Sequence, residues 1–344
     1  MTGRRALISK AFEITLEDVE ICEGLKSNEV LIETEWTFIS AGTEIANFTG
    51  LDQGVHTPGA WNAYPHVPGY ANCGRVVDCG SDVRGIERGQ RVFSQSPHVS
   101  HQVLVPEASD LVVVPIPDDV SSDVAAAIRM GLVSMTALQT ADFDLNDYVA
   151  IFGLGLVGNI AAQLFNLAGA RVIGVDPRPT RCTVARNVGV EQVIAGEADA
   201  CIEQLWDLSS GGVRVAVDAV GDAGIVASAV RCVRPYGEVI VLGSPRREFP
   251  GDLNAFLKPV HYEWVTIKGA LEHKIPRNPG PGIRYSVAAN AATVLDLVRC
   301  GRLRLGDLLS HRMDIQDIAS AYEGLLNEPD VYWGVALDWT AKET

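Results

Sequence analysis

The spacing of hydrophobic residues divides the chain into two kinds of sequence. Over roughly the first 110 residues it is typical of short β-strands, since apolar and polar residues alternate in stretches such as Val30–Trp36. The Ala-rich segment 121–140 is predicted to be a helix, with Ser121 or Ser122 as its N-terminal cap. From Tyr148 onward, short apolar runs alternate with helical segments, which favours a parallel sheet covered by helices.

Several apolar runs after Tyr148 have the length of buried parallel strands. The predicted strands are 149–152, 171–175, 191–194, 213–219, 238–243 and 264–268. A Pro/Gly-rich stretch at 276–282 ends this pattern, and a helix is expected over about 286–300. The sequence therefore predicts an α/β chain with a doubly wound parallel sheet, and 344 residues are enough for two domains with separate cores.

One strand–helix–strand passage has the spacing of a dinucleotide-binding fingerprint. The glycines stand in the run Gly153-Leu154-Gly155-Leu156-Val157-Gly158, and the next strand ends at Asp176. Gly153 allows a tight turn, Gly155 lets the backbone approach a pyrophosphate, and Gly158 permits close packing of helix on strand. The amides of Leu156 and Val157 at the helix start face the anion. Asp176 follows Gly153 by 23 residues and is expected to accept hydrogen bonds from ribose hydroxyls.

The choice between NAD and NADP depends on the residues around Asp176. Its carboxylate would repel a 2′-phosphate, so NAD is favoured. Arg178 and Arg181 can pair with that phosphate, so NADP stays as the alternative. Further backbone contacts to the nicotinamide are expected after two later strands, at Val220, Gly221, Gly243 and Ser244.

Composition narrows the partners. A formal net charge of −15 argues against nucleic acid or an anionic membrane as partner. No stretch approaches the ~18 uninterrupted apolar residues of a membrane span, and the N-terminal sequence lacks the apolar region of a signal peptide. The seven cysteines are scattered singly, which is typical of reduced thiols. The sequence therefore predicts a cytoplasmic protein that acts on a small molecule.

Several motifs outside the fingerprint carry a family resemblance. They are the segments 67–76 (VPGYANCGRV), 89–92 (GQRV), 266–270 (TIKGA), 309–314 (LSHRMD) and the helical segment 315–325. With the glycine fingerprint, they make the chain resemble the medium-chain dehydrogenase/reductase superfamily, which includes zinc alcohol dehydrogenases. The resemblance implies a GroES-like, partly open β-barrel domain over 1–130 and 272–344 and a Rossmann domain over 131–271. It also implies a substrate cleft between the domains and a homodimer formed through the edge strand at about 264–268.

The sequence departs from that family at the zinc ligands. Where zinc members carry Cys-Gly-Ser/Thr-Asp, this chain has Ala41-Gly42-Thr43-Glu44, and their Gly-His-Glu segment is matched by Gly69-Tyr70-Ala71. The third ligand position falls near Met130, and the four-cysteine lobe of the structural zinc has no counterpart. Alanine, neutral tyrosine and methionine are poor zinc ligands, so no metal is expected. The chain resembles a zinc-lacking branch that includes bacteriochlorophyllide dehydrogenase-like and sugar or cyclitol oxidoreductase-like proteins.

Without a metal, a side chain must stabilise or protonate the oxygen at which hydride transfer builds negative charge. Tyr70 is the first candidate acid, Thr43 a proton relay, Glu44 an orienting group and His66 a second relay. Each also has a structural interpretation: a packed aromatic, a threonine in a turn, a backbone cap and a loop histidine. His98 and His101 have a spacing that could suit a metal, but strand-like neighbours and the lack of a nearby carboxylate disfavour it.

These observations predict a zinc-independent, NAD(P)-dependent oxidoreductase that interconverts a secondary alcohol and a ketone on a polar ring. A sugar, an aminocyclitol or an aminoglycoside intermediate would suit the resemblance. Two alternatives stay open at this point: a quinone or enone reductase, and a nucleotide-binding regulator without catalytic activity.

Overall fold

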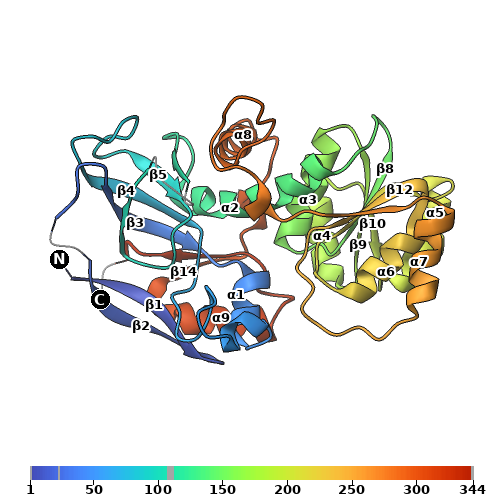
Figure 1. The fold of residues 1–344 in the computed structure, drawn as a ribbon, viewed down its shortest axis with the longest axis horizontal. Coiled ribbons are helices and arrows are strands. Elements are labelled where there is room, and N and C mark those ends of the chain that lie inside the picture. The colour runs from blue at the N-terminus through green and yellow to red at the C-terminus, as the bar shows by residue number, and fades with distance from the viewer. Residues whose placement is uncertain (1, 22–23, 107–111, 342–344) are drawn as a thin grey trace. The chain divides into compact units, whose positions relative to one another are not determined.

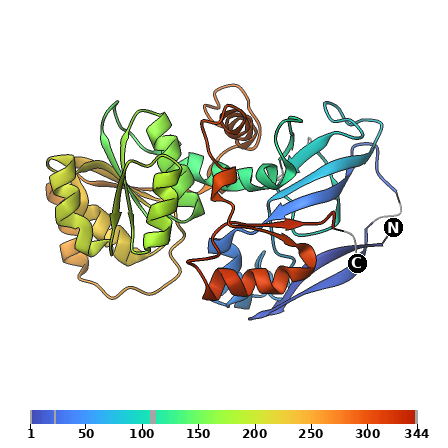
Figure 2. The same ribbon diagram turned by 180° about the vertical axis from the view of Figure 1, so that it is seen from behind.

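The chain forms two units in the computed structural model, which describes residues 2–21, 24–106 and 112–341 (Figures 1 and 2). The first unit comprises Met1–Arg129, Ile275–Gly301 and Leu305–Thr344. The second comprises Met130–Lys274 and Arg302–Arg304. Six cysteines in the described part of the chain are free thiols, and Cys22 lies outside the described residues.

The first unit is rich in β-structure, as the alternating sequence predicts. Its main sheet has the strand order β14-β15-β3-β4-β5-β7 with β6 added beside β3, and β1 and β2 form a separate antiparallel pair. The strands are β1 (Thr2–Lys10), β2 (Glu13–Glu20), β3 (Val30–Phe38), β4 (Asn72–Cys79), β5 (Arg91–Ser94), β6 (His101–Leu104), β7 (Val113–Pro115), β14 (His311–Asp314) and β15 (Val335–Asp338).

Helices cover the first unit and supply part of its core. They are α1 (Ala41–Phe48), α2 (Ser122–Thr140), which continues into the second unit, α8 (Val287–Arg299) and α9 (Ile318–Asn327), with short 3-10 turns η1 (Gln53–His56), η4 (Gly306–Leu308) and η5 (Ile315–Asp317). The strands β3 and β4 lie close together at Gly74, where a Cβ atom would be 2.3 Å from the carbonyl oxygen of Glu33. Gly74, the second glycine of the 67–76 motif, is therefore required by strand packing.

The second unit is a parallel six-stranded sheet with the order β10-β9-β8-β11-β12-β13. Its strands are β8 (Tyr148–Phe152), β9 (Arg171–Asp176), β10 (Gln192–Ala195), β11 (Val213–Asp218), β12 (Val233–Val241) and β13 (Thr266–Gly269). Between them lie α3 (Leu156–Leu167), α4 (Pro179–Asn187), η2 (Asp199–Cys201), α5 (Ile202–Ser209), α6 (Ala223–Cys232), α7 (Leu253–Tyr262) and η3 (Glu272–Lys274). The order reverses between β8 and β11, which is the doubly wound topology that the sequence predicts.

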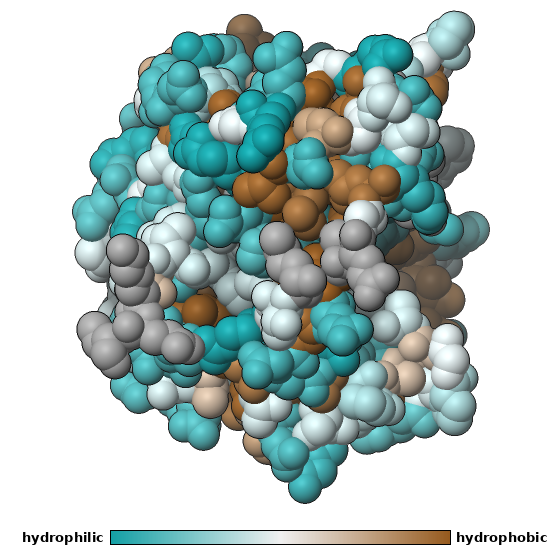
Figure 3. Space-filling view, turned by 90° about the vertical axis from the view of Figure 1, so that its left-hand side faces the viewer, coloured by the Kyte–Doolittle hydropathy of each residue, from teal (hydrophilic) through white to brown (hydrophobic). Residues whose placement is uncertain are grey.

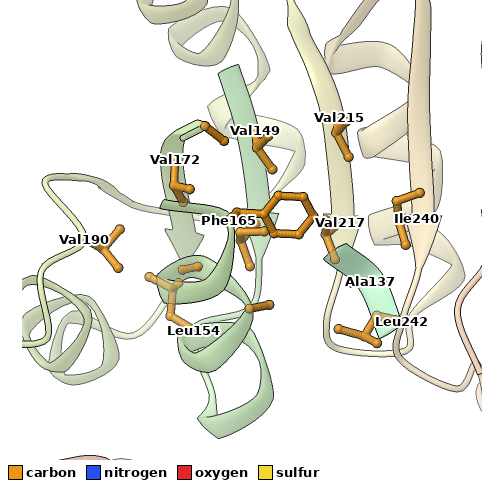
Figure 4. Packing of buried hydrophobic residues seen from close by; sticks show 14 of the residues in the cluster. Ala137, Val149, Leu154, Phe165, Val172, Val190, Val215, Val217, Ile240 and Leu242 are labelled. Atoms are coloured by element: carbon orange, nitrogen blue, oxygen red, sulfur yellow. The ribbon is translucent and has the colours of Figure 1, made fainter. Parts of the chain in front are cut away.

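Both faces of this sheet are buried, which explains the nearly continuous apolar runs in its strands. Along β8, Val149 and Ile151 belong to one core cluster, whereas Ala150 and Phe152 belong to the cluster on the other face. Figure 4 shows Phe165 of α3 among side chains of the central strands, including Val217. The fold class is thus confirmed: an α/β chain with a sheet-rich unit and a Rossmann-like unit.

Figure 3 shows one face of the molecule, on which hydrophilic residues prevail and hydrophobic residues gather in smaller groups. Among the described residues, no helix is both long enough and apolar enough to span a bilayer.

Candidate active site

The glycine fingerprint forms the turn between β8 and α3. Gly153 has φ of +89°, a conformation that favours glycine, and a Cβ at Gly158 would lie 1.7 Å from the carbonyl oxygen of Gly153. Gly155 is the N-cap of α3, and a Cβ there would meet only Arg181 Nη1, at 3.7 Å. Gly153 and Gly158 are therefore required by the fold, whereas the space beside Gly155 is open at the amino end of a helix.

The carboxylate of Asp176 is fixed at the end of β9. It is 2% exposed and accepts hydrogen bonds from the backbone amides of Leu154 at 2.7 Å and Arg178 at 2.8 Å. The guanidinium of Arg181 lies 3.9 Å from the same carboxylate. The acid and both arginines named from the sequence thus lie beside the glycine turn, with Asp176 bonded to it directly.

Two loops that follow β11 and β12 lie against each other. A Cβ at Gly221, which has φ of +84°, would be 2.4 Å from the carbonyl oxygen of Ser244, and one at Gly243 would be 2.1 Å from the amide nitrogen of Gly221. Asp218 accepts hydrogen bonds from the amides of Val220 and Gly221 at 2.9 and 3.0 Å. Burial raises the pKa of Asp218, and the sequence analysis did not single out this residue. It shapes the loop that carries Val220 and Gly221.

In the first unit, Tyr70 lies against the start of helix α1. Its hydroxyl donates to Oγ of Ser40, the residue before α1, and is also hydrogen-bonded to the side chain of Thr43. The guanidinium carbon of Arg129 lies 5.0 Å from the centroid of the Tyr70 ring. Burial raises the pKa of Tyr70, and the positive charge of Arg129 opposes that rise. Tyr70 and Thr43 therefore meet, as the sequence suggested, in a group that also includes Ser40 and Arg129.

Thr43 lies in helix α1 rather than in the turn considered from the sequence. Glu44, on the same helix, is 1% exposed and accepts hydrogen bonds from Ser40 N at 2.7 Å, His98 Nε2 at 2.9 Å and the Tyr322 hydroxyl. In the described part of the chain, Glu44 is linked to Tyr70 through Ser40 rather than by a direct bond. Its contact to Ser40 N closes the first turn of α1 and fixes the position of the Ser40 backbone.

His98 braces the loop that carries Tyr70. Its amide donates to the carbonyl oxygen of Pro68 at 2.8 Å, and its ring leaves no room for a Cβ at Gly69. The expectation that no carboxylate lies near His98 was wrong, since Glu44 comes from a segment 54 positions earlier. His101 instead contacts Ser100 Oγ at 3.1 Å. The two histidines have different partners, and the pair does not form one site.

His66 lies inside the first unit. It is 8% exposed, and among the described residues neither ring nitrogen has a hydrogen-bond partner. Its ring stacks on Tyr64 with the centroids 6.0 Å apart. Burial lowers the pKa of His66 below its ordinary value, while Glu44 opposes that change. His66 is therefore not a surface residue; it forms an isolated β-bridge with Ile8, and burial favours the neutral form of its ring.

The residues at the zinc-ligand positions do not form a ligand set. Ala41 has no donor atom, Tyr70 is bonded to Ser40, and Met130 is 2% exposed. Within the described ranges, no group of three or more His, Cys, Asp and Glu side chains could hold a metal ion. The carboxylate of Glu44 and the imidazole of His98 are hydrogen-bonded to each other.

Removal of the Glu44 carboxylate should destabilise the first unit. In Glu44→Ala, buried donors of Ser40, His98 and Tyr322 lose their acceptor, so we expect the free energy of unfolding to fall by about 3 kcal/mol. Urea unfolding followed by circular dichroism measures this change. Glu17→Ala, which removes a half-exposed partner of Arg5, is the matched control with a small expected effect. Equal unfolding midpoints for the two variants would contradict the structural role of Glu44.

Comparisons with known proteins agree with this fold. Residues 157–278 match the family model described as zinc-binding dehydrogenase. The chain is 26% identical to an alcohol dehydrogenase of Cupriavidus necator over 238 residues, which cover 68% of this chain and 61% of that protein. It is 27% identical to D-guloside 3-dehydrogenase of Escherichia coli K12, over 82% of this chain and 85% of that protein.

Solved structures have the same fold. A protein of Sinorhizobium meliloti, described as a zinc-binding dehydrogenase and bound to NADP, superposes with a TM-score of 0.78 at 20% identity, covering 98% of this chain and 99% of that one. The fingerprint, the two units and these matches make the chain similar to the medium-chain dehydrogenase/reductase superfamily. The relatives named above are dehydrogenases, and the chain spans 61% and 85% of their lengths.

Proposed function

We propose that the protein is a zinc-independent dehydrogenase/reductase that uses NAD to interconvert a secondary alcohol and a ketone on a polar ring. The observation that carries the proposal is the Tyr70 hydroxyl, hydrogen-bonded to Ser40 and Thr43 where zinc relatives place metal ligands. The hydride-transfer half of the reaction is assigned to the second unit and the proton-transfer half to the first.

The geometry of the glycine turn supports dinucleotide binding. The amides of Leu156 and Val157 begin α3 beside Gly155, where, among the described residues, a Cβ would meet the Arg181 side chain at 3.7 Å and nothing closer. Asp176, held by two backbone amides, keeps acceptor capacity for ribose hydroxyls. When bound, the nicotinamide group supplies or accepts a hydride. Val220, Gly221, Gly243 and Ser244 are proposed to flank the nicotinamide ring with backbone groups.

NAD is proposed as the preferred cofactor over NADP. The Asp176 carboxylate stands at the position that the 2′-phosphate of NADP would approach, and the two negative charges would repel each other. The Arg181 guanidinium lies 3.9 Å from the Asp176 carboxylate, and Arg178 is the N-cap residue of α4. We propose that both arginines border the adenosine ribose.

Tyr70 is proposed as the acid of ketone reduction and the base of alcohol oxidation. Its O–H group protonates the substrate oxygen, and Ser40 and Thr43 stabilise the phenolate that remains. Thr43 relays a proton to that phenolate. Glu44 holds the start of α1 in place, and His66, whose ring nitrogens are buried, is proposed as a second relay inside the first unit.

Independence from zinc is supported by the donor set rather than by the family name. The matched family is named for zinc, but the match covers 157–278, which includes neither Ala41 nor Tyr70. Alanine supplies no ligand atom, and the Glu44 carboxylate and His98 Nε2 are bonded to each other.

A sugar-like substrate is supported by one relative. The Escherichia coli protein is named for the dehydrogenation of a D-guloside, and its alignment covers 82% of this chain. We therefore propose a sugar, an aminocyclitol or an aminoglycoside intermediate as substrate.

The proposed function can be tested with a panel of substrates and NADH or NADPH. The panel includes enones and ketones, among them keto-sugars and keto-cyclitols, and turnover is followed by the absorbance of the reduced nicotinamide. We expect turnover of a cyclic keto-polyol with NADH, preference for NADH over NADPH, and no loss of activity after dialysis against a chelator. Turnover of enones alone would indicate a double-bond reductase. Saturable NADH binding without turnover would indicate a regulator, and a stoichiometric zinc needed for activity would overturn the metal-free mechanism.

A homodimer and a cytoplasmic location complete the proposal. Apolar side chains are exposed beside and on the edge strand β13, and the molar mass from light scattering tests whether they pair two copies. They are Leu253, Leu257, Tyr262, Trp264 and Ile267. The free, dispersed cysteines of the described residues support a reducing compartment, which localisation of the tagged protein tests.

A further inference from the structure

The position of Arg129 is not accounted for by the function proposed above. Arg129 comes from helix α2, is 2% exposed, and has its guanidinium carbon 5.0 Å from the centroid of the Tyr70 ring. Burial of a guanidinium is costly, because the charge loses water. A cation within about 6 Å of an aromatic face recovers part of that cost. The placement thus joins a permanent charge to the ring of the proposed acid.

Other polar groups also face Tyr70 or its loop, and they act on it with different signs. From α1, Ser40 and Thr43 give hydrogen bonds that favour the phenolate, while the Glu44 charge disfavours it. Tyr322 of α9 and His98 both bind Oε2 of Glu44, whereas Ser40 N binds Oε1, and His66 interacts electrostatically with Glu44. Arg129 contributes a permanent positive charge to this set. Its charge lowers the pKa of Tyr70 and so opposes the rise that burial causes.

We infer that Arg129 is a positioning residue that stabilises the phenolate form of Tyr70. This inference rests on the proposed role of Tyr70 as acid and base. In ketone reduction, for which a bound reduced nicotinamide would supply the hydride to the carbonyl carbon, the O–H bond of Tyr70 breaks as the O–H bond of the alcohol forms. The electron pair of the broken bond stays on the phenolate, which is where the charge of Arg129 acts.

The inference predicts an asymmetry between the two directions of the reaction. Tyr70 must be protonated for reduction and deprotonated for oxidation. A higher pKa without Arg129 would therefore move the rise of the oxidation rate to higher pH, and it would leave reduction at neutral pH nearly unchanged. A defect limited to folding would lower both rates together.

The decisive experiment measures the ionisation of Tyr70 without any substrate. Protein labelled with carbon-13 at the tyrosine ring carbon that bears oxygen is titrated by NMR, and the Tyr70 resonance is the one missing from Tyr70→Phe. In Arg129→Gln we expect the pKa of Tyr70 to rise by about one unit, while Arg129→Lys, which keeps the charge, retains most of the wild-type value. Arg84→Gln, on an exposed turn, is the matched control.

Each outcome supports or overturns the inference. An equal Tyr70 pKa in wild type and Arg129→Gln, or no ionisation of wild-type Tyr70 while the fold persists, overturns it. If Arg129→Gln does not fold, Arg129→Met and Arg129→Lys give the same comparison between a neutral and a charged side chain. The proposed function is tested separately, by the loss of turnover in Tyr70→Phe. That result does not depend on the titration of Tyr70.

Discussion

Replacing Tyr70 by phenylalanine should lower turnover of the ketone substrate by about 10²- to 10⁴-fold, the usual contribution of a positioned acid or base. The ring stays, so the contact with Arg129 is kept while the hydroxyl that meets Ser40 and Thr43 is lost. Because NADH binding is assigned to the second unit, its dissociation constant should be unchanged. Single-turnover reduction followed by NADH absorbance, with calorimetry of NADH binding, measures both quantities.

Two further variants separate catalysis from structure. Tyr64→Phe also removes a phenol that is hydrogen-bonded within the first unit, to the carbonyl oxygen of Asn47, and should retain nearly full turnover. Thr43→Val removes the proposed relay and should cost less than Tyr70→Phe, because Ser40 still contacts the phenol. If Tyr70→Phe and Thr43→Val both keep wild-type turnover, the assignment of acid and relay is wrong.

The second unit could be predicted closely from the sequence because its signals are local. An apolar strand, a glycine turn and a terminal acid all lie between Tyr148 and Asp176, and the structure joins them by backbone contacts. The start of β12 was misjudged. The strand begins at Val233 rather than near residue 238. Its first part was missed because it contains exposed residues such as Arg234 and Tyr236. A short exposed stretch of strand has no apolar pattern that could reveal it.

The candidate site in the first unit was only partly predictable. Tyr70 and Thr43 were found by resemblance to the zinc-ligand segments. Ser40 and Arg129 were missed, since their contacts with Tyr70 join residues 30 and 59 positions away in the chain. The pairing of Glu44 with His98 was missed for the same reason. A buried carboxylate needs hydrogen-bond donors, but the sequence does not say which distant donor the fold brings to it.

The glycine turn provides a test that separates cofactor binding from folding. In Gly155→Ala, the added Cβ would meet Arg181 Nη1 at 3.7 Å and no other described residue beyond its chain neighbours within 4 Å, so the free energy of unfolding should stay near the wild-type value. The same methyl group would occupy the space through which the diphosphate approaches the start of α3. We therefore expect the affinity for NADH to fall by more than about tenfold, as measured by calorimetry, since a lost close approach of this kind costs at least ~1.4 kcal/mol.

Gly158→Ala is the matched variant, in which stability rather than NADH affinity is expected to fall first. Its Cβ would lie 1.7 Å from the carbonyl oxygen of Gly153, a backbone atom that cannot move without opening the turn between β8 and α3. We expect the thermal unfolding midpoint to fall by several degrees, and NADH binding to weaken only because the turn is distorted. If Gly155→Ala instead loses stability and keeps its affinity for NADH, then Gly155 serves the fold and the diphosphate must be bound elsewhere. The contrast is informative because both variants add one methyl group, three residues apart, and the structure gives only one of them room.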